Sequence, residues 1–331
     1  MKTLRWSDLS AGERRAVLAR PEQRQSAELQ ASVGTIVQQV REGGWEALCG
    51  IAERLDGEKP RLVPVAAAAN EARRQYGQDL IAAMELAAAN IRAFHEASVP
   101  AEVALETVPG LTVRKVWRAI DPVGLYVPGG RTPLFSTLLM LVVPALAAGV
   151  RELVVVTPPR PEGGLNPAIA LAAELCGIDA IWTVGGAQAI AALAFGAGDI
   201  PPVSKICGPG SAWVSAAKSI VAALSGGPSI DMPAGPSELM VIADDGADPA
   251  VVAADLLSQA EHDAAAQVIL ATDSEQLAQA VGDELRRQVA DLPRWELAEA
   301  ALASGTILVA DDLTGAVEIA NLYAPEHLCL A

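Results

Sequence analysis

Residues 152–185 have the sequence ELVVVTPPRPEGGLNPAIALAAELCGIDAIWTVG, in which a β-branched run, a longer apolar helical segment and a second β-branched run follow one another. This is the order of a β-α-β unit, in which a helix connects two parallel strands. The same rhythm begins near residue 112, and a second series of strands and helices begins at residue 237. The sequence therefore predicts an α/β fold with parallel sheets that carry helices on their faces.

Two clusters rich in proline and glycine, DPVGLYVPGG and IDMPAGPSE, bracket the first series. They predict that residues 122–236 form a Rossmann-like α/β unit inserted into a second Rossmann-like unit. We expect the outer unit to combine residues 25–121, which are largely helical in pattern, with residues 237–331. Residues 1–24 are expected to form an N-terminal arm.

The overall charge of the chain excludes some partners. The 24 basic and 40 acidic residues give a net charge of −16, which repels phosphate backbones and anionic lipid. Nucleic-acid and membrane partners are therefore not expected. Residues 132–150 carry no charge and are long enough to span a bilayer, but prolines, Ser and Thr interrupt them, so we expect a buried helix.

The four cysteines are widely scattered and form no C-x-x-C pair. The N-terminus also lacks the apolar segment of a secretion signal. Both observations favour a cytoplasmic protein with reduced thiols.

Glycine-rich turns are the first candidates for ligand binding. YVPGGR, residues 126–131, follows a predicted strand and could form an anion-binding nest of backbone N–H groups. CGPGSAW places Gly208 and Gly210 at a strand-to-helix turn, where a helix N-terminus favours phosphate. The full G-x-G-x-x-G pattern fails because residue 213 is Trp, and tight turns explain these glycines equally well.

Two further motifs carry side chains capable of chemistry. SQAEH places Gln259 and His262 on one face of a predicted helix, as ligands for a divalent metal such as Zn²⁺ or as an ordinary polar surface. PEHL places Glu326 beside His327 where a strand opens. A carboxylate there can align or deprotonate water while the imidazole moves protons, and the alternative is an ion-paired strand end.

Taken together, several long motifs resemble the histidinol dehydrogenase family. They are VGLYVPGGRTPLFSTLLML, VGGAQAIAALAFG, KICGPGSAWV, IDMPAGPSELMVIAD, DLLSQAEHD and YAPEHL, in order from about residue 110 to the end. The resemblance implies a zinc-dependent, NAD-linked, four-electron oxidation of L-histidinol to L-histidine through histidinal, the last steps of histidine biosynthesis. It also implies a homodimer.

The resemblance assigns roles to residues at matching positions. It implies that NAD is contacted by Tyr126, Gln188 and Ser211. It implies that the substrate is contacted by Ser237, Gln259, His262 and His327. The implied zinc ligands are Gln259 and His262, and the implied proton-transfer pair is Glu326 and His327.

The chain departs from the family in two places. The family usually has Asn where this chain has Ser211, a shorter side chain, so NAD affinity could fall by about 0.5–1.5 kcal/mol. Family members also continue well past PEHL, so we expect this chain to be C-terminally truncated inside a core strand. Two further zinc ligands, an Asp and a His, would then be missing, and we expect weak zinc binding and little or no turnover.

Two other functions stay open from the sequence alone. A related NAD-dependent polyol dehydrogenase of the same family would share these motifs. A catalytically dead, truncated paralogue that acts as a binding or partner subunit would fit Ser211 and the missing ligands, although it would have no need of Glu326 and His327.

Overall fold

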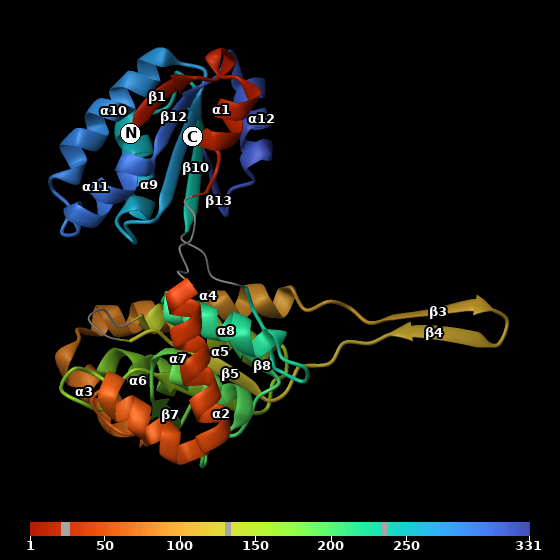
Figure 1. The fold of residues 1–331 in the computed structure, drawn as a ribbon. Coiled ribbons are helices and arrows are strands. Elements are labelled where there is room, and N and C mark those ends of the chain that lie inside the picture. The colour runs from red at the N-terminus through yellow and green to blue at the C-terminus, as the bar shows by residue number, and fades with distance from the viewer. Residues whose placement is uncertain (21–26, 130–133, 233–236) are drawn as a thin grey trace. The chain divides into compact units, whose positions relative to one another are not determined.

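The computed structural model describes four stretches of the chain, shown as coloured ribbon in Figure 1: residues 1–20, 27–129, 134–232 and 237–331. They form two compact units. Unit 1 comprises residues 1–24 and 235–331, and unit 2 comprises residues 25–234. Unit 2 is therefore inserted into unit 1. Each unit contains a sheet with parallel strands, which confirms the predicted fold class.

The sheet of unit 2 has the strand order β2-β7-β6-β5-β8-β9. β2 lies antiparallel to β7, and the other neighbouring strands are parallel. From β5 the chain builds outward through β6 and β7 on one side and later through β8 and β9 on the other, so the order reverses between β5 and β8. The six strands are β2 (Leu62–Pro64), β5 (Val123–Tyr126), β6 (Leu153–Thr157), β7 (Ala180–Thr183), β8 (Lys205–Cys207) and β9 (Ser229–Ile230).

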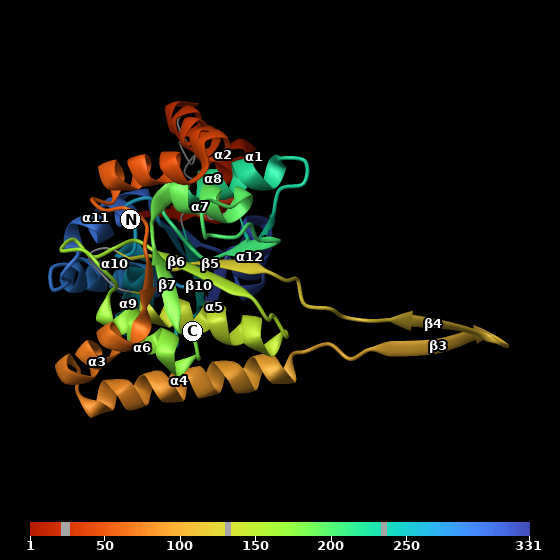
Figure 2. The ribbon, with the colours of Figure 1, turned by 90° about the horizontal axis from the view of Figure 1, so that it is seen from below.

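Helices cover both faces of this sheet, and Figure 2 shows the resulting layers. Successive strand residues point to opposite faces, so Leu125 and Tyr126 belong to different core clusters. One cluster contains residues of α2 (Ala27–Leu55), α7 (Gly186–Phe195) and α8 (Ala212–Ala223). The other contains residues of α3 (Val65–Gln75), α4 (Gln78–Ala97), α5 (Phe135–Ala147) and α6 (Pro167–Leu175).

The uncharged segment that we expected to be a buried helix contains α5. Leu138, Leu139, Val142 and Val143 of this helix are fully buried, whereas Met140 is exposed. Among the helices that the structure describes, none has the length and apolar character needed to cross a bilayer.

Residues 25–121 lie in unit 2, which differs from the expected division. β2 extends the unit 2 sheet next to β7, and Val37 and Leu48 of α2 pack in the same cluster as α7 and α8. An amphipathic pattern predicts that a helix buries one face, but it does not say which sheet that face covers. The physical reason for the difference is that α2 packs against α7 and α8, α3 packs against α6, and α4 packs against α5, all within unit 2.

An antiparallel hairpin, β3 (Val103–Val108) and β4 (Leu111–Lys115), extends away from unit 2, and β4 lies where the strand pattern was expected to begin, near residue 112 (Figures 1 and 2). Leu105 pairs with Val113, and Glu106 pairs with Thr112, so the two pairs lie on opposite faces of the hairpin. The face of Leu105 and Val113 is mainly apolar, with Lys115 at its end, and the other face is mainly polar. Leu105 and Val113 are 60% and 55% exposed.

Unit 1 has a five-stranded parallel sheet in the order β1-β12-β11-β10-β13. The strands are β1 (Lys2–Arg5), β10 (Glu238–Ala243), β11 (Gln267–Thr272), β12 (Thr306–Val309) and β13 (His327–Leu330). The N-terminal segment is more than an arm, because it supplies the edge strand β1 and the helix α1 (Ala11–Val17).

The two faces of the unit 1 sheet carry separate cores. Leu239 and Val241 of β10 pack with α9 (Pro249–Ala260), α10 (Glu275–Val289) and α11 (Trp295–Ser304). Met240 and Ile242 pack with α12 (Leu313–Tyr323) and with Trp6. The alternation along β10 is that of a strand buried on both faces, which is typical of a parallel sheet.

Candidate functional site

Three of the expected ligand-binding residues lie at the carboxyl edge of the unit 2 sheet. Tyr126 is the last residue of β5, Gln188 lies in the first turn of α7 after β7, and Ser211 is the N-cap of α8 after β8. Because β5, β7 and β8 run in the same direction, their carboxyl ends meet at one edge. The strand order reverses between β5 and β8, and ligands of open α/β sheets bind at such a point.

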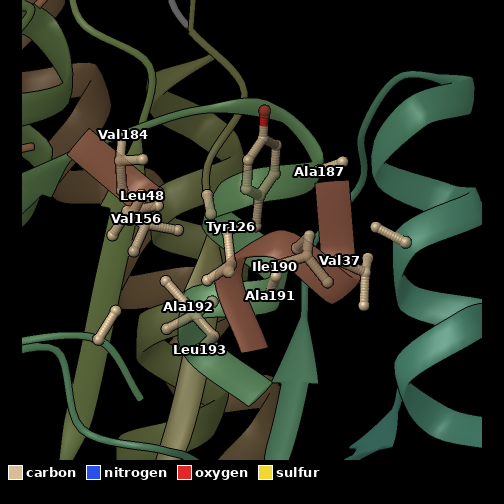
Figure 3. Close-up of a cluster of buried hydrophobic side chains, with 14 of the residues drawn as sticks. Val37, Leu48, Tyr126, Val156, Val184, Ala187, Ile190, Ala191, Ala192 and Leu193 are labelled. Carbon is tan, nitrogen blue, oxygen red and sulfur yellow. The ribbon is translucent and has the colours of Figure 1, made fainter. Parts of the chain in front are cut away.

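Tyr126 presents a neutral hydroxyl at this edge. Its ring is buried among aliphatic side chains, and Figure 3 shows the hydroxyl directed away from them. Burial raises the pKa of Tyr126 to about 12, so the phenol stays protonated near neutrality. The hydroxyl oxygen accepts a hydrogen bond from the Gly186 N–H at 3.3 Å, which leaves its own proton to donate to a ligand.

Gln188 is held by a carboxylate that the sequence did not single out. Its Nε2 donates to Oδ2 of Asp56 at 3.0 Å, and the same oxygen accepts the Gly185 N–H at 3.1 Å. Gln188 is 1% exposed, and its Oε1 is buried without a hydrogen-bond partner among the residues described. Buried polar atoms are nearly always paired, so this oxygen is an acceptor available to a ligand.

Asp56 follows directly after α2, 132 residues before Gln188. Its neighbours in sequence, Leu55 and Gly57, carry no signal of a site, so sequence reasoning had no means of finding it. Burial raises the pKa of Asp56, and the hydrogen bonds from Gly185 and Gln188 act in the opposite direction.

We expect Asp56→Ala to lower the free energy of unfolding by about 1–3 kcal/mol, because the buried Gly185 N–H and Gln188 Nε2 lose their acceptor. Asp56→Asn is the matched control, since one amide oxygen can accept both hydrogen bonds and the loss should be smaller. Urea unfolding measures both. An alanine variant as stable as the wild type would contradict the role of Asp56.

The pH dependence of the same measurement has a definite sign. The pKa of Asp56 is raised in the folded protein, so its favourable contribution is complete below the ordinary value of 3.8 and is lost as pH rises through the raised pKa. Asp56→Asn lacks this titration. Relative to the wild type, it should therefore gain stability between pH 3.8 and neutrality.

The turn before α8 is fixed by a buried lysine. Lys218 is 2% exposed, and its Nζ donates to the Gly208 carbonyl at 2.9 Å and forms an ion pair with Asp231. Asp231 Oδ2 accepts the Gly208 N–H at 2.7 Å. These contacts leave Ser211 exposed at the N-terminus of α8, where its side chain makes no capping hydrogen bond. Anions bind favourably at such a terminus.

The nest expected over residues 126–131 is only partly described. Residues 130–133 lie outside the residues that the structure describes. The described part ends at Gly129, where a Cβ would stand 3.0 Å from the carbonyl oxygen of Pro158.

The other expected site residues lie at the amino edge of the unit 1 sheet. Ser237 precedes β10, and Glu326 and His327 lie where β13 begins. α9 crosses from β10 back to the start of β11, which brings Gln259 and His262 to the same edge. The structure thus gathers five residues at one edge of unit 1, from segments up to 90 residues apart in sequence.

The helix predicted to carry both Gln259 and His262 is shorter than expected. α9 ends at Ala260, so His262 lies in the following turn, where its N–H donates to the Gln259 carbonyl at 3.2 Å. His262 is exposed, whereas Gln259 is 8% exposed with a buried Nε2 that has no partner among the described residues. Amide oxygen and nitrogen positions are assigned from hydrogen bonds, so either atom can occupy this unpaired position.

His327 has a defined tautomer. Its Nδ1 lies 3.1 Å from the backbone carbonyl oxygen of Glu238. Because a carbonyl only accepts, Nδ1 must carry the hydrogen, and the neutral imidazole then presents the lone pair of Nε2. Oε2 of Glu326 lies 3.9 Å from the same Nδ1, and both side chains are open to solvent.

Comparisons with known proteins agree with the motifs. The family model described as histidinol dehydrogenase matches residues 18–331. The chain is 47% identical to the histidinol dehydrogenase of Xanthomonas campestris pv. campestris and 46% identical to that of Xylella fastidiosa. Both matches cover 100% of this chain and 77% of the relative. The crystal structure of histidinol dehydrogenase from Elizabethkingia anophelis superimposes with a TM-score of 0.93 at 40% identity, covering 100% of this chain and 76% of that chain.

Proposed function

The chain belongs to the histidinol dehydrogenase family, NAD-dependent oxidoreductases that oxidise L-histidinol in histidine biosynthesis. From this premise we propose which of its residues bind the cofactor, bind the substrate and transfer protons. We assign NAD to the carboxyl edge of unit 2 and L-histidinol with zinc to the amino edge of unit 1. The observation that carries the proposal is the pairing of His327 Nδ1 with the Glu238 carbonyl, because it makes Nε2 the basic nitrogen of the imidazole, while Oε2 of Glu326 lies 3.9 Å from Nδ1 of the same ring.

The cofactor assignment is supported by complementary polar groups. Tyr126 offers a hydroxyl proton, Gln188 offers a buried Oε1, and Ser211 stands at the N-terminus of α8. NAD carries ribose hydroxyls and a carboxamide for the first two groups and a pyrophosphate for the helix terminus. NAD supplies the hydride acceptor when it is bound.

The zinc assignment is supported by the donor atoms of Gln259 and His262. The unpaired amide position of Gln259 and the exposed imidazole of His262 are acceptable zinc ligands, so these residues fit the metal. The described residues contain no cluster of three or more His, Cys, Asp or Glu side chains that could hold a metal alone. Gln259 and His262 would hold the zinc, which would supply a Lewis acid that helps to orient the substrate.

Proton transfer is assigned to the Glu326–His327 pair. In the first oxidation, Nε2 of His327 takes the proton of the substrate hydroxyl as hydride leaves the carbinol carbon. In the second oxidation, Glu326 takes a proton from the water that adds to the aldehyde. Two hydrides therefore leave one carbon, and water supplies the second oxygen of the carboxylate product. Ser237, which precedes β10 at the same edge, is assigned to substrate binding.

The test is the stoichiometry of NADH formation with L-histidinol, measured on the purified protein extended by the C-terminal residues that the family resemblance implies. We expect two NADH per histidine formed, loss of the activity after treatment with a chelator, and recovery when zinc is returned. Histidinal accumulating with one NADH would contradict the role of Glu326. Full activity in the chelator would contradict the zinc assignment.

We also propose that the protein forms a homodimer in the cytoplasm. The location is in keeping with four free cysteines, Cys49, Cys176, Cys207 and Cys329. The dimer is supported by the β3–β4 hairpin, whose apolar face, including Leu105 and Val113, is open to solvent. An isolated two-stranded hairpin is only marginally stable in water, so a partner surface would stabilise it.

We expect Val113→Lys to weaken the dimer at least about 10-fold, because the variant buries a charge in an apolar interface. Thr112→Lys is the matched control, since Thr112 lies on the polar face opposite Glu106. Sedimentation velocity over a range of concentrations measures the dissociation constant. Equal effects of the two variants would contradict the use of the apolar face.

A further inference from the structure

Arg20 contacts the segment that leads into the Glu326–His327 pair. It follows α1 in unit 1, and its Nη2 donates to the carbonyl oxygens of Tyr323 and Ala324 at 3.1 and 3.0 Å. These are the last carbonyls of α12, which have no partner within the helix. A guanidinium at this end satisfies them and also matches the negative end of the helix dipole. The guanidinium lies over the Tyr323 ring, 4.8 Å from its centroid.

The backbone that Arg20 holds has an unusual conformation. Ala324 ends α12 with φ of +51° and ψ of +65°, in the left-handed region that L-residues other than glycine rarely adopt. This residue reverses the chain from α12 into β13, and His327 follows three residues later. A strained residue persists when its surroundings fix it, and the hydrogen bond from Arg20 to its carbonyl is such a contact.

Arg20 also holds the residue that orients the imidazole. Its Nη2 donates to Oε2 of Glu238 at 2.9 Å, and its Nε pairs with the other carboxylate oxygen. The backbone carbonyl of this same Glu238 receives Nδ1 of His327. The guanidinium of Arg20 therefore contacts both the Ala324 turn, which precedes His327, and Glu238, whose carbonyl fixes the tautomer of His327.

The segment that carries Arg20 is itself tied to the sheet. Gln267, at the start of β11, is 4% exposed and uses both ends of its amide. Its Nε2 donates to the Ala19 carbonyl at 3.3 Å, and its Oε1 accepts the Tyr323 hydroxyl at 2.9 Å. The planar fork of arginine is suited to this bridging role, because it donates in several fixed directions at once.

We propose that Arg20 is a positioning residue for the proton-transfer pair, holding the Ala324 turn and Glu238 so that His327 keeps its Nδ1–H tautomer and presents Nε2 to the substrate. This inference rests on the proposed function of Glu326 and His327. It assigns a role in the reaction to a residue in the first 20 of the chain, more than 300 positions before the side chain that it orients.

The experiment compares Arg20→Met and Arg20→Lys with Arg5→Met. Arg5 is a matched control because it also forms ion pairs in unit 1, with Glu275 and Asp311, away from the end of α12. The chain has three histidines, so ¹⁵N spectra of the neutral imidazoles can be assigned with His95→Gln and His262→Gln. We expect His327 to be the Nδ1–H tautomer in the wild type and in Arg5→Met, and a mixture of tautomers in Arg20→Met.

Steady-state kinetics give the second readout. We expect Arg20→Met to lower kcat by about 10–100-fold with little change in KM for NAD, because a small displacement of a catalytic group is costly. Arg20→Lys keeps the charge but cannot bridge the carboxylate and both carbonyls, so it should restore only part of the rate. Methylguanidinium added to Arg20→Ala should restore activity and the tautomer.

Thermal unfolding separates positioning from simple stabilisation. An Arg20→Met variant that is folded at the assay temperature and has the wild-type His327 tautomer and kcat would overturn the proposal. If Arg20→Met does not fold, the same outcomes are read from Arg20→Lys and from methylguanidinium rescue. A wild-type kcat in His327→Gln would instead overturn the proposed function, so the two failures are distinguishable.

Discussion

Replacing His327 by glutamine is expected to lower kcat by about 10²–10⁴-fold, the range for loss of a general base. Glutamine can keep a hydrogen bond to the Glu238 carbonyl through its amide, but it has no basic nitrogen in place of Nε2. The loss should appear mainly in kcat, because the variant leaves the Tyr126 and Gln188 contacts of unit 2 unchanged. NADH formation over a range of histidinol concentrations measures it.

The control for this prediction is His95→Gln. His95 lies near the end of α4 in unit 2, where its ring packs edge-on against Phe94. We expect this variant to have the wild-type kcat. A loss of equal size in both variants would contradict the assignment of the base to His327.

Replacing Gly208 by alanine is expected to lower the free energy of unfolding by about 3–5 kcal/mol. Two costs add at this position. Gly208 has φ of +129°, which side-chain-bearing residues rarely adopt, and a Cβ would lie 2.0 Å from the carbonyl oxygen of Tyr126. Backbone must therefore move, and the turn clamped by Lys218 and Asp231 would be lost. Urea unfolding measures the change in stability.

Gly226→Ala separates the two costs. Gly226 also has a positive φ, +77°, but a Cβ there would meet nothing within 4 Å. We expect this variant to lose only about 1–2 kcal/mol, the cost of a left-handed backbone for an L-residue. If both variants lose the same free energy of unfolding, the close approach of Gly208 to Tyr126 adds nothing to the cost of the substitution.

Much of the fold could be predicted from the sequence because its strands are buried on both faces. β6 (LVVVT) and β10 (ELMVIA) are nearly continuous apolar runs, which are typical of strands in parallel sheets covered by helices on both faces. The short edge strand β1 (KTLR) could not be predicted in this way, because one basic residue lies at each end and its strand conformation depends on pairing with β12. Propensity in such segments is overridden by tertiary contacts.

Among the site residues, those in contiguous motifs could be predicted from the sequence, and those whose partners are distant in sequence could not. Motifs that are contiguous in sequence, such as PEHL, located Glu326 and His327 directly. Asp56 and Arg20 could not be found, because their partners lie 132 and more than 200 residues away and only the fold brings them together. The sequence predicts that α9 continues through Glu261 and His262, because both residues are compatible with a helix, whereas the backbone turns after Ala260.

The pairing of β1 with β12 has a consequence for protein synthesis. Lys2 is aligned with Thr306, so β1 leaves the ribosome about 300 residues before the neighbouring strand with which it pairs. Unit 2 is complete once residue 234 has emerged, and chains generally fold domain by domain as they are made. The inserted unit therefore folds first. For roughly 4–14 s after unit 2 is complete, at about 5–20 residues per second, β1 still lacks its neighbour, and apolar side chains of residues 1–20, Trp6 among them, are open to chaperones.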